Sequence, residues 1–122
     1  DEHYKEGEGF HTFDFEDKKL MVGICGDFWH EEYLNEASKI DKDLVLWPVY
    51  TDFAPKVWNE EEKYEYAKEA TLLKAPVLYV NSVCYDFDED YIAKGGAAYF
   101  ANGMIISEVP SGSEAVLTCE IK

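Results

Sequence analysis

Three short, continuously apolar segments constrain the fold of this chain more than any other feature. They are residues 20–25, 44–47 and 77–80. An unbroken apolar run of this length is typical of a strand covered on both faces, as in the middle of a parallel sheet. Two segments, one in each interval between these runs, carry apolar residues at helical spacing. These residues are Trp29, Tyr33, Ala37 and Ile40, and then Tyr66, Ala67, Ala70 and Leu73. The alternation of strands and helices predicts an α/β fold.

The ends of these elements are predicted from local signals. Alternating aromatic residues over 10–15 indicate a half-buried strand ahead of the first apolar run. We expect Pro48 to end the second buried strand, because proline cannot donate to a sheet ladder. Asn59 followed three residues later by Glu62 resembles a capping box. The second helix is therefore predicted to begin near Asn59 and to end before Pro76.

The pattern changes after residue 81, where short strands are predicted over 97–100, 104–109 and 116–121. Asn102-Gly103 is a hairpin signal between the first two of these strands. No repeat or linker divides the chain, so residues 1–122 are predicted to form a single partial domain. Three buried strands need cover on both faces, and two helices do not supply it. We therefore expect a missing N-terminal half or a partner chain.

Charge and composition exclude several classes of function. The chain has 26 acidic and 11 basic residues, and its net charge of -15 repels phosphate backbones and anionic membrane surfaces. No apolar run approaches the roughly 18 to 20 residues that span a bilayer. Neither cysteines nor histidines show metal-ligand spacing, and reduced thiols fit a cytoplasmic protein. We expect no nucleic acid, membrane or metal partner. The cysteines are Cys25, Cys84 and Cys119.

Cys25 stands at the point where the first buried strand gives way to a predicted helix. Backbone N–H groups at a helix N-terminus stabilise negative charge, so a thiolate at this position is favoured. Gly26 leaves the approach to the sulfur open, and Asp27 is suited to cap the helix. A buried structural cysteine at a strand end is the alternative interpretation.

The segment around Cys25 resembles the nucleophile segment of the nitrilase superfamily of carbon–nitrogen hydrolases. The matching sequence is Val22-Gly23-Ile24-Cys25-Gly26-Asp27, followed by Glu32 on the next helix. Similarity continues on both sides and covers essentially the whole chain. The further matches are Gly7, Phe10 and Phe13, the strand 43–48 that ends in Pro48, Trp58, the strand 77–81, Gly95-Gly96-Ala97, 102–106 and 115–117.

The resemblance implies a layered α-β-β-α sandwich, of which this chain would supply the C-terminal half, and a homo-oligomer. It implies hydrolysis of a non-peptide C–N bond in a small amide, carbamoyl compound or nitrile, through a thioester and without a cofactor. Cys25 would be the nucleophile and the Gly26 N–H an oxyanion donor. Asp27 and Glu32 would support the site.

Other groups of the site follow from the same resemblance. Tyr50, Thr51 and Asn81 would line the substrate pocket. The family also uses a glutamate base and a lysine, and both are expected upstream of Cys25. Glu2 is the candidate for an orienting acid, and no lysine of this chain stands at the family's position. The parent protein is therefore expected to be an enzyme, and this chain alone is expected to be inactive.

Two other hypotheses remain. A Cys-His-Asp hydrolase on an α/β-hydrolase fold would need Gly-x-Cys-x-Gly, but Asp27 stands in place of the second glycine. His30, the one histidine after Cys25, is too close in the chain to serve as the base. The other hypothesis is a catalytically incomplete nitrilase-like fragment or pseudoenzyme that acts as an interaction module.

Overall fold

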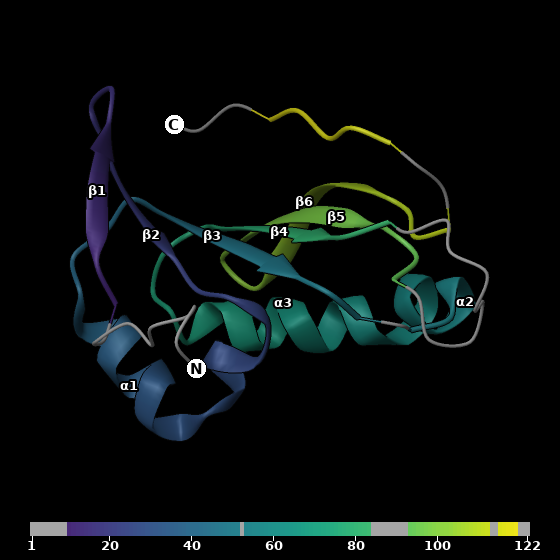
Figure 1. The fold of residues 1–122 in the computed structure, drawn as a ribbon, viewed down its shortest axis with the longest axis horizontal. Helices are drawn as coiled ribbons and strands as arrows, with labels where there is room; N and C mark the ends of the chain where they lie inside the picture. The colour runs from purple at the N-terminus through teal and green to yellow at the C-terminus, as the bar shows by residue number, and fades with distance from the viewer. Residues whose placement is uncertain (1–9, 52, 84–92, 113–114, 120–122) are drawn as a thin grey trace, which may run out of the picture.

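The computed structural model describes residues 10–51, 53–83, 93–112 and 115–119, which form a six-stranded sheet with helices on one side (Figure 1). The strands lie side by side in chain order. The strands are β1 Thr12–Phe15, β2 Lys18–Val22, β3 Leu44–Val49, β4 Val77–Asn81, β5 Ala97–Ala101 and β6 Met104–Val109. The helices are the 3₁₀ turn η1 Cys25–Trp29, α1 Glu31–Lys39, α2 Pro55–Val57, the π segment η2 Trp58–Glu62 and α3 Lys63–Thr71. None of the described helices is both long and apolar enough to cross a membrane.

The centre of the sheet is parallel and its flanks are antiparallel. β2 pairs with β3 and β3 with β4 in parallel, whereas β1, β5 and β6 join their neighbours in antiparallel fashion. The parallel centre matches the three continuously apolar runs, so this prediction is confirmed. In this register Val22 lies opposite Leu46, and Val49 lies opposite Asn81. The carboxyl ends of the three parallel strands therefore meet at one edge, which is where open α/β sheets bind ligands.

The hydrophobic core lies between the sheet and its helical layer. Alternate residues of the parallel strands point to this side, and Trp47 and Tyr79 are the largest fully buried side chains there. α3 contributes Tyr66 to the same core, Leu73 joins it just after α3 ends, and α1 contributes Ala37. Residues of both helices were predicted to be apolar contacts, and those of α3 are confirmed in full. On α1, Ala37 is buried whereas Tyr33 is 46% exposed.

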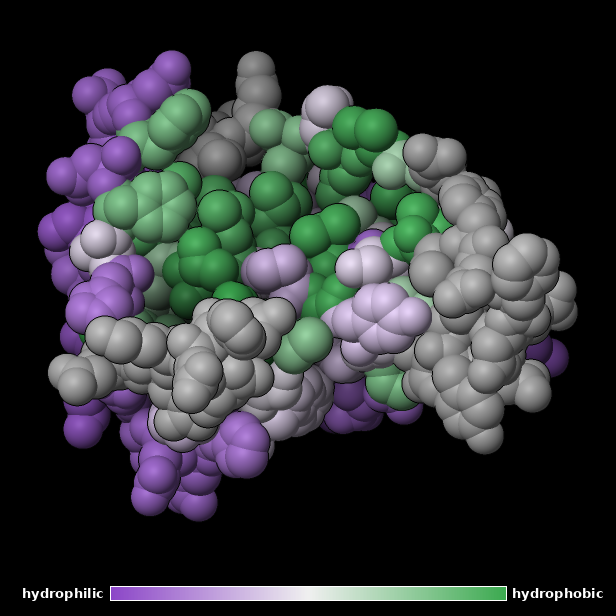
Figure 2. Space-filling view, viewed as in Figure 1, coloured by the Kyte–Doolittle hydropathy of each residue, from purple (hydrophilic) through white to green (hydrophobic). Residues whose placement is uncertain are grey.

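The other face of the sheet is apolar and largely open. A hollow of about 470 Å³ lies there, between the sheet and the C-terminal segment. In Figure 2, hydrophobic residues gather over the middle of the molecule, and hydrophilic residues lie along the side where Figure 1 draws β1 and α1. The described residues thus supply one helical layer and one sheet of the predicted four-layer sandwich. The residues that line the hollow include Val22, Leu46, Pro48, Leu78, Val80, Ala115, Val116 and Leu117.

Pro48 does not end its strand. This prediction is wrong because the backbone nitrogen of Pro48 points to a side of β3 where no strand lies beside it. β3 continues to Val49, and Pro48 lies opposite Val80 of β4. Leu46, two residues earlier, accepts the Gly23 N–H across the β2 side. The backbone groups of Pro48 therefore point to the same side as those of Leu46. β2 has already ended at this level, so no strand there needs the N–H that proline lacks.

The second helix begins earlier than its capping signal indicates. It starts at Pro55 and runs through η2 into α3, so the predicted capping box at Asn59 is wrong. The overlooked signal is proline at the first helical position, where its fixed φ suits the helix and its missing N–H costs nothing. Asn59 instead bonds a distant loop: its Oδ1 accepts the Ser111 N–H at 3.1 Å.

The predicted last strand is also wrong over its described part. Residues 115–119 form no strand, and Val116 is 84% exposed. This segment runs as a single extended stretch over the open face of the sheet, across a hollow, and no described strand pairs with it (Figure 1). An alternating apolar pattern alone is therefore insufficient here, because a strand also requires a partner for its backbone groups. The rest of the predicted strand lies outside the described residues.

Gly23 should be required by the packing of the core. A Cβ placed on Gly23 would overlap the Phe28 ring, whereas a Cβ on Gly26 would meet nothing within 4 Å. Gly23→Ala should therefore lower the free energy of unfolding by about 1–3 kcal/mol, because overpacking forces strain on the core. Gly26→Ala is the matched control and should change it by less. Chemical denaturation of the two variants measures both values, and equal losses would contradict this packing.

Stability should also fall at alkaline pH because of buried tyrosines. Burial raises the pKa of Tyr79 well above its ordinary value of 10.0, and the Thr51 side chain offsets this only in part. The folded state then holds the proton where the unfolded state has lost it. The contribution of Tyr79 to the free energy of unfolding is therefore fully present below pH 10 and declines as the pH rises further. Tyr79→Phe should reduce this decline in denaturation curves taken above pH 10, and an unchanged decline would show that Tyr79 is not its source.

Candidate active site

Cys25 occupies a sharp turn between β2 and η1. Its backbone is left-handed, with a φ of 50°. A residue with a side chain pays roughly 1–3 kcal/mol for such a conformation, and these residues cluster at active sites. The turn lifts Cys25 out of the β2 strand at the carboxyl edge of the parallel strands. The local geometry is therefore that of a residue presented to the edge where ligands bind.

Two hydrogen bonds bracket this turn. The Asp27 carboxylate accepts the Ile24 N–H at 3.0 Å, and the Asp27 N–H donates to the Ile24 carbonyl at 3.1 Å. The loop between Ile24 and Asp27 is closed on both sides, with Cys25 inside it. Asp27 was predicted to cap the helix and support the site, and in this geometry its carboxylate caps the turn that holds Cys25.

The Cys25 sulfur receives a backbone donor from the neighbouring strand. The Tyr50 N–H donates to Sγ at 3.3 Å. Tyr50 directly follows β3, so the parallel pairing of β2 with β3 is what brings this donor to the sulfur. Cys25 itself is half-buried. A sulfur at an accessible edge with a fixed N–H donor is an arrangement that a thiolate can use, because hydrogen bonds to an ionised acceptor are strong.

Gly26 is exposed, as an oxyanion donor would have to be. Among the described residues, its N–H donates to no backbone oxygen. The predicted helix at this point is different, however. η1 is a 3₁₀ turn of five residues, and α1 begins only at Glu31. Cys25 thus lies where the strand gives way to helical structure, as predicted, but the amphipathic helix expected there is divided at His30 into η1 and α1.

Asn81 joins the two loops beside Cys25. Its Oδ1 accepts the Thr51 N–H at 2.9 Å, and its Nδ2 donates to the Thr51 carbonyl and the Gly95 carbonyl, each at 3.1 Å. Asn81 is only 7% exposed. Its amide is thus engaged with backbone groups and holds the loop after β3 in place. Of the predicted pocket residues, Tyr50 is the most open to solvent, at 50%.

A cluster of aromatic rings forms the floor under Cys25. Trp47 lies with its ring centre 5.1 Å from Phe28 and 5.1 Å from Tyr66, and Trp29 lies 5.2 Å from Tyr66. Burial raises the pKa of Tyr66, and the adjacent Trp29 side chain opposes this shift. The Trp47 indole also donates to the Cys25 carbonyl oxygen at 2.8 Å. The only sequence signal for this contact was an aromatic residue at the end of a buried strand.

The remaining predicted groups lie apart from the sulfur or outside the described residues. Glu32 is exposed on α1, and Glu2 and Cys84 fall outside the described residues. His30 precedes α1 and its ring packs against Tyr33 at 5.4 Å. Within the described ranges no three His, Cys, Asp or Glu side chains gather as a metal site. The assembled part of the site is therefore Cys25, Gly26, Asp27, Tyr50, Thr51 and Asn81.

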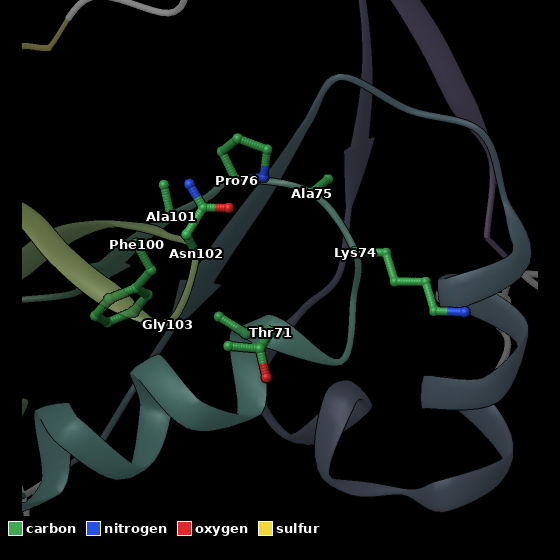
Figure 3. Close-up of a pocket in the computed structure, with 9 residues that line it drawn as sticks. Thr71, Lys74, Ala75, Pro76, Phe100, Ala101, Asn102 and Gly103 are labelled. Atoms are coloured by element: carbon green, nitrogen blue, oxygen red, sulfur yellow. The ribbon is translucent and has the colours of Figure 1, made fainter.

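A second hollow, of about 540 Å³, lies at the opposite end of the sheet (Figure 3). Pro76, just before β4, and Asn102, in the turn after β5, lie on its rim. In Figure 3 the Lys74 side chain extends away from Pro76 and Asn102 toward α1. The hollow thus faces the amino ends of the parallel strands and brings no charged group toward Pro76 and Asn102. We do not assign the active site to it.

Comparison with known proteins shows similarity to solved structures only. Neither a protein-family profile nor a curated protein matches this chain. Solved structures do match. One is the glutamine-dependent NAD+ synthetase from Acinetobacter baumannii, with a TM-score of 0.71 and 25% identity over 93% of this chain. The match covers 21% of the synthetase chain.

The amidase from Nesterenkonia sp. AN1, of the nitrilase superfamily, matches in several forms. One form has a TM-score of 0.65 and 14% identity, and the match covers 88% of this chain and 40% of the amidase. Another, which carries the acetamide moiety of fluoroacetamide on its active-site cysteine, has a TM-score of 0.68 and 15% identity. This chain thus spans from a fifth to two fifths of these proteins. The predicted fold is confirmed: the described residues share the fold of these proteins, one of which is an amidase of the nitrilase superfamily, and correspond to a part of it.

Proposed function

We propose that Cys25 is the nucleophile of a hydrolase that cleaves the C–N bond of a small amide. One observation carries the proposal. Cys25 is held in a left-handed turn at the carboxyl edge of the parallel strands, and its Sγ accepts the Tyr50 N–H. Strain at a non-glycine residue persists only where the surroundings over-determine it, and such positions cluster at active sites. The likeness to an amidase with an active-site cysteine supports the same assignment.

The chemistry proceeds through a thioester. The sulfur attacks the amide carbon, and the electron pair of the C=O bond moves to oxygen. The Gly26 N–H, which is exposed and engaged with no backbone oxygen of the described residues, donates to this oxyanion. The C–N bond then breaks, the nitrogen takes a proton and leaves as ammonia or amine, and water hydrolyses the thioester to acid and free thiol. No cofactor is required.

The base and the lysine of this proposal come from outside the described residues. A thiol needs a base to accept its proton, and no described carboxylate contacts the Cys25 sulfur. Glu2 stays a candidate for the orienting acid. The experiments below therefore use the full-length protein. A catalytically incomplete fragment that acts as an interaction module is the alternative, and the open apolar sheet face is the feature that favours an assembly, including a homo-oligomer.

Primary amides are the preferred substrate class, with carbamoyl compounds and nitriles as further candidates. Tyr50 and Trp29, at 50% and 46% exposure, are the partly open aromatic side chains of the segments beside Cys25. Their size favours a small acyl group over a long one. The two solved relatives are a glutamine-dependent enzyme and an amidase. A substrate panel should therefore start with short aliphatic amides and glutamine, followed by ureido acids and nitriles.

Alkylation kinetics test the nucleophile. Cys25 should react with iodoacetamide at neutral pH several-fold faster than Cys119, because Cys25 has a fixed N–H donor whereas burial raises the pKa of Cys119. Peptide mapping by mass spectrometry gives the rate for each cysteine, including Cys84. Cys25→Ser supplies the background for the other two thiols. If Cys25 reacts no faster than Cys84 and Cys119, the catalytic assignment fails and the interaction module becomes the better account.

A further inference from the structure

We propose that Trp47 is a positioning residue that orients the Gly26 N–H, the oxyanion donor in the acylation of Cys25. The proposal rests on the proposed function and concerns one hydrogen bond, from the Trp47 indole to the Cys25 carbonyl oxygen at 2.8 Å. That carbonyl belongs to the peptide between Cys25 and Gly26, which is the same peptide that carries the Gly26 N–H. A peptide unit is planar and trans, so its C=O and N–H point in opposite directions. Fixing the carbonyl therefore fixes the direction of the N–H.

The peptide needs such a fixed point. Gly26 has no side chain, and a Cβ placed there would meet nothing within 4 Å. Glycine populates many backbone conformations, so packing at Gly26 restrains this peptide little, and the 3₁₀ turn η1 and the Trp47 indole are what hold it. Cys25, on the other side of the peptide, is in the strained left-handed region. With the carbonyl bonded toward the core, the Gly26 N–H is directed away from the core, toward the exposed edge where an oxyanion would form.

Trp47 itself is held rigidly enough to act as this anchor. It is completely buried, and its position in β3 lies opposite Tyr79 of β4. Its ring is enclosed by Phe28, Tyr66 and Tyr79, with ring centres 5.1 to 6.2 Å away. β3 and the residue that follows it thus make two separate contacts with Cys25. Trp47 sets the carbonyl and through it the Gly26 N–H, whereas Tyr50 contacts the sulfur.

These two contacts can be separated by the choice of reagent. Alkylation by iodoacetamide is a displacement at a saturated carbon and forms no oxyanion. Acylation by p-nitrophenyl acetate passes through a tetrahedral oxyanion before p-nitrophenolate leaves and the acetyl thioester remains. Trp47→Phe in the full-length protein should therefore slow acylation of Cys25 about tenfold or more. Alkylation of Cys25 should stay within about twofold, because the Tyr50 donor is retained.

Trp58→Phe is the matched control. Trp58 is a buried tryptophan of the same aromatic cluster, with its ring centre 4.6 Å from that of Tyr79. The Trp58→Phe variant should lose a similar amount of packing, but acylation of Cys25 should not slow more than alkylation does. For hydrolysis of an amide, Trp47→Phe should lower kcat and leave KM nearly unchanged, because the oxyanion exists only along the reaction path. If Trp47→Phe does not fold, replacing Trp47 with benzothienylalanine keeps the ring shape and removes only the N–H.

The outcomes are distinct. Selective loss of acylation with Trp47→Phe, absent with Trp58→Phe, supports the proposal. Equal loss of acylation and alkylation, or loss of neither, overturns it while the proposed function stands. A wild-type Cys25 that is neither acylated nor alkylated faster than Cys119 overturns both.

Discussion

Cys25 keeps a left-handed backbone, and the neighbouring elements are arranged to hold it there. The conformation costs about 1–3 kcal/mol, and a single hydrogen bond contributes only about 0.5–1.5 kcal/mol. Several contacts are therefore needed. The Asp27 carboxylate closes the turn locally, and the Trp47 indole fixes the Cys25 carbonyl. The Gly23 N–H bond to the Leu46 carbonyl, at 3.1 Å, ties the start of the turn to β3.

The same side chains serve the core and the candidate site. Trp47, Tyr66 and Tyr79 fill the space between the sheet and α3, and Trp47 also contacts the peptide of Cys25. Asn81 works in a similar way at the end of β4, where its amide fixes the loop that carries Tyr50 and Thr51. Because parallel strands end at one edge, small shifts in strand register would move the sulfur and its donor apart. The site is thus as rigid as the sheet beneath it.

Much of the fold could be predicted from the sequence, since it depends on local patterns. The three apolar runs predicted the parallel strands, and the residues around Cys25 predicted the turn at the sheet edge. Pro48 and Asn59 were misread because their surroundings are set by distant residues. Pro48 lies in β3 only because β2 ends beside it, and Asn59 is inside a helix and bonds Ser111. Neither partner is visible in the local sequence.

The site was predictable in part for the same reason. Cys25, Gly26 and Asp27 are adjacent in the chain, and Tyr50, Thr51 and Asn81 follow strands whose ends meet. Trp47 was missed as a contact because its role depends on the β2–β3 register and on the direction of one peptide. At 14–25% identity to the solved relatives, the fold is retained although most side chains differ. The base and the lysine are not among the described residues and stay a prediction.

Trapping of the acyl-enzyme tests the central claim most directly. The full-length protein is mixed with a short aliphatic amide, quenched in acid and mapped by mass spectrometry. We expect an acyl group on the Cys25 peptide alone, and hydroxylamine should remove it, since it would be a thioester. An acyl group found only on another residue, or none on Cys25 while the amide is hydrolysed, would contradict the account.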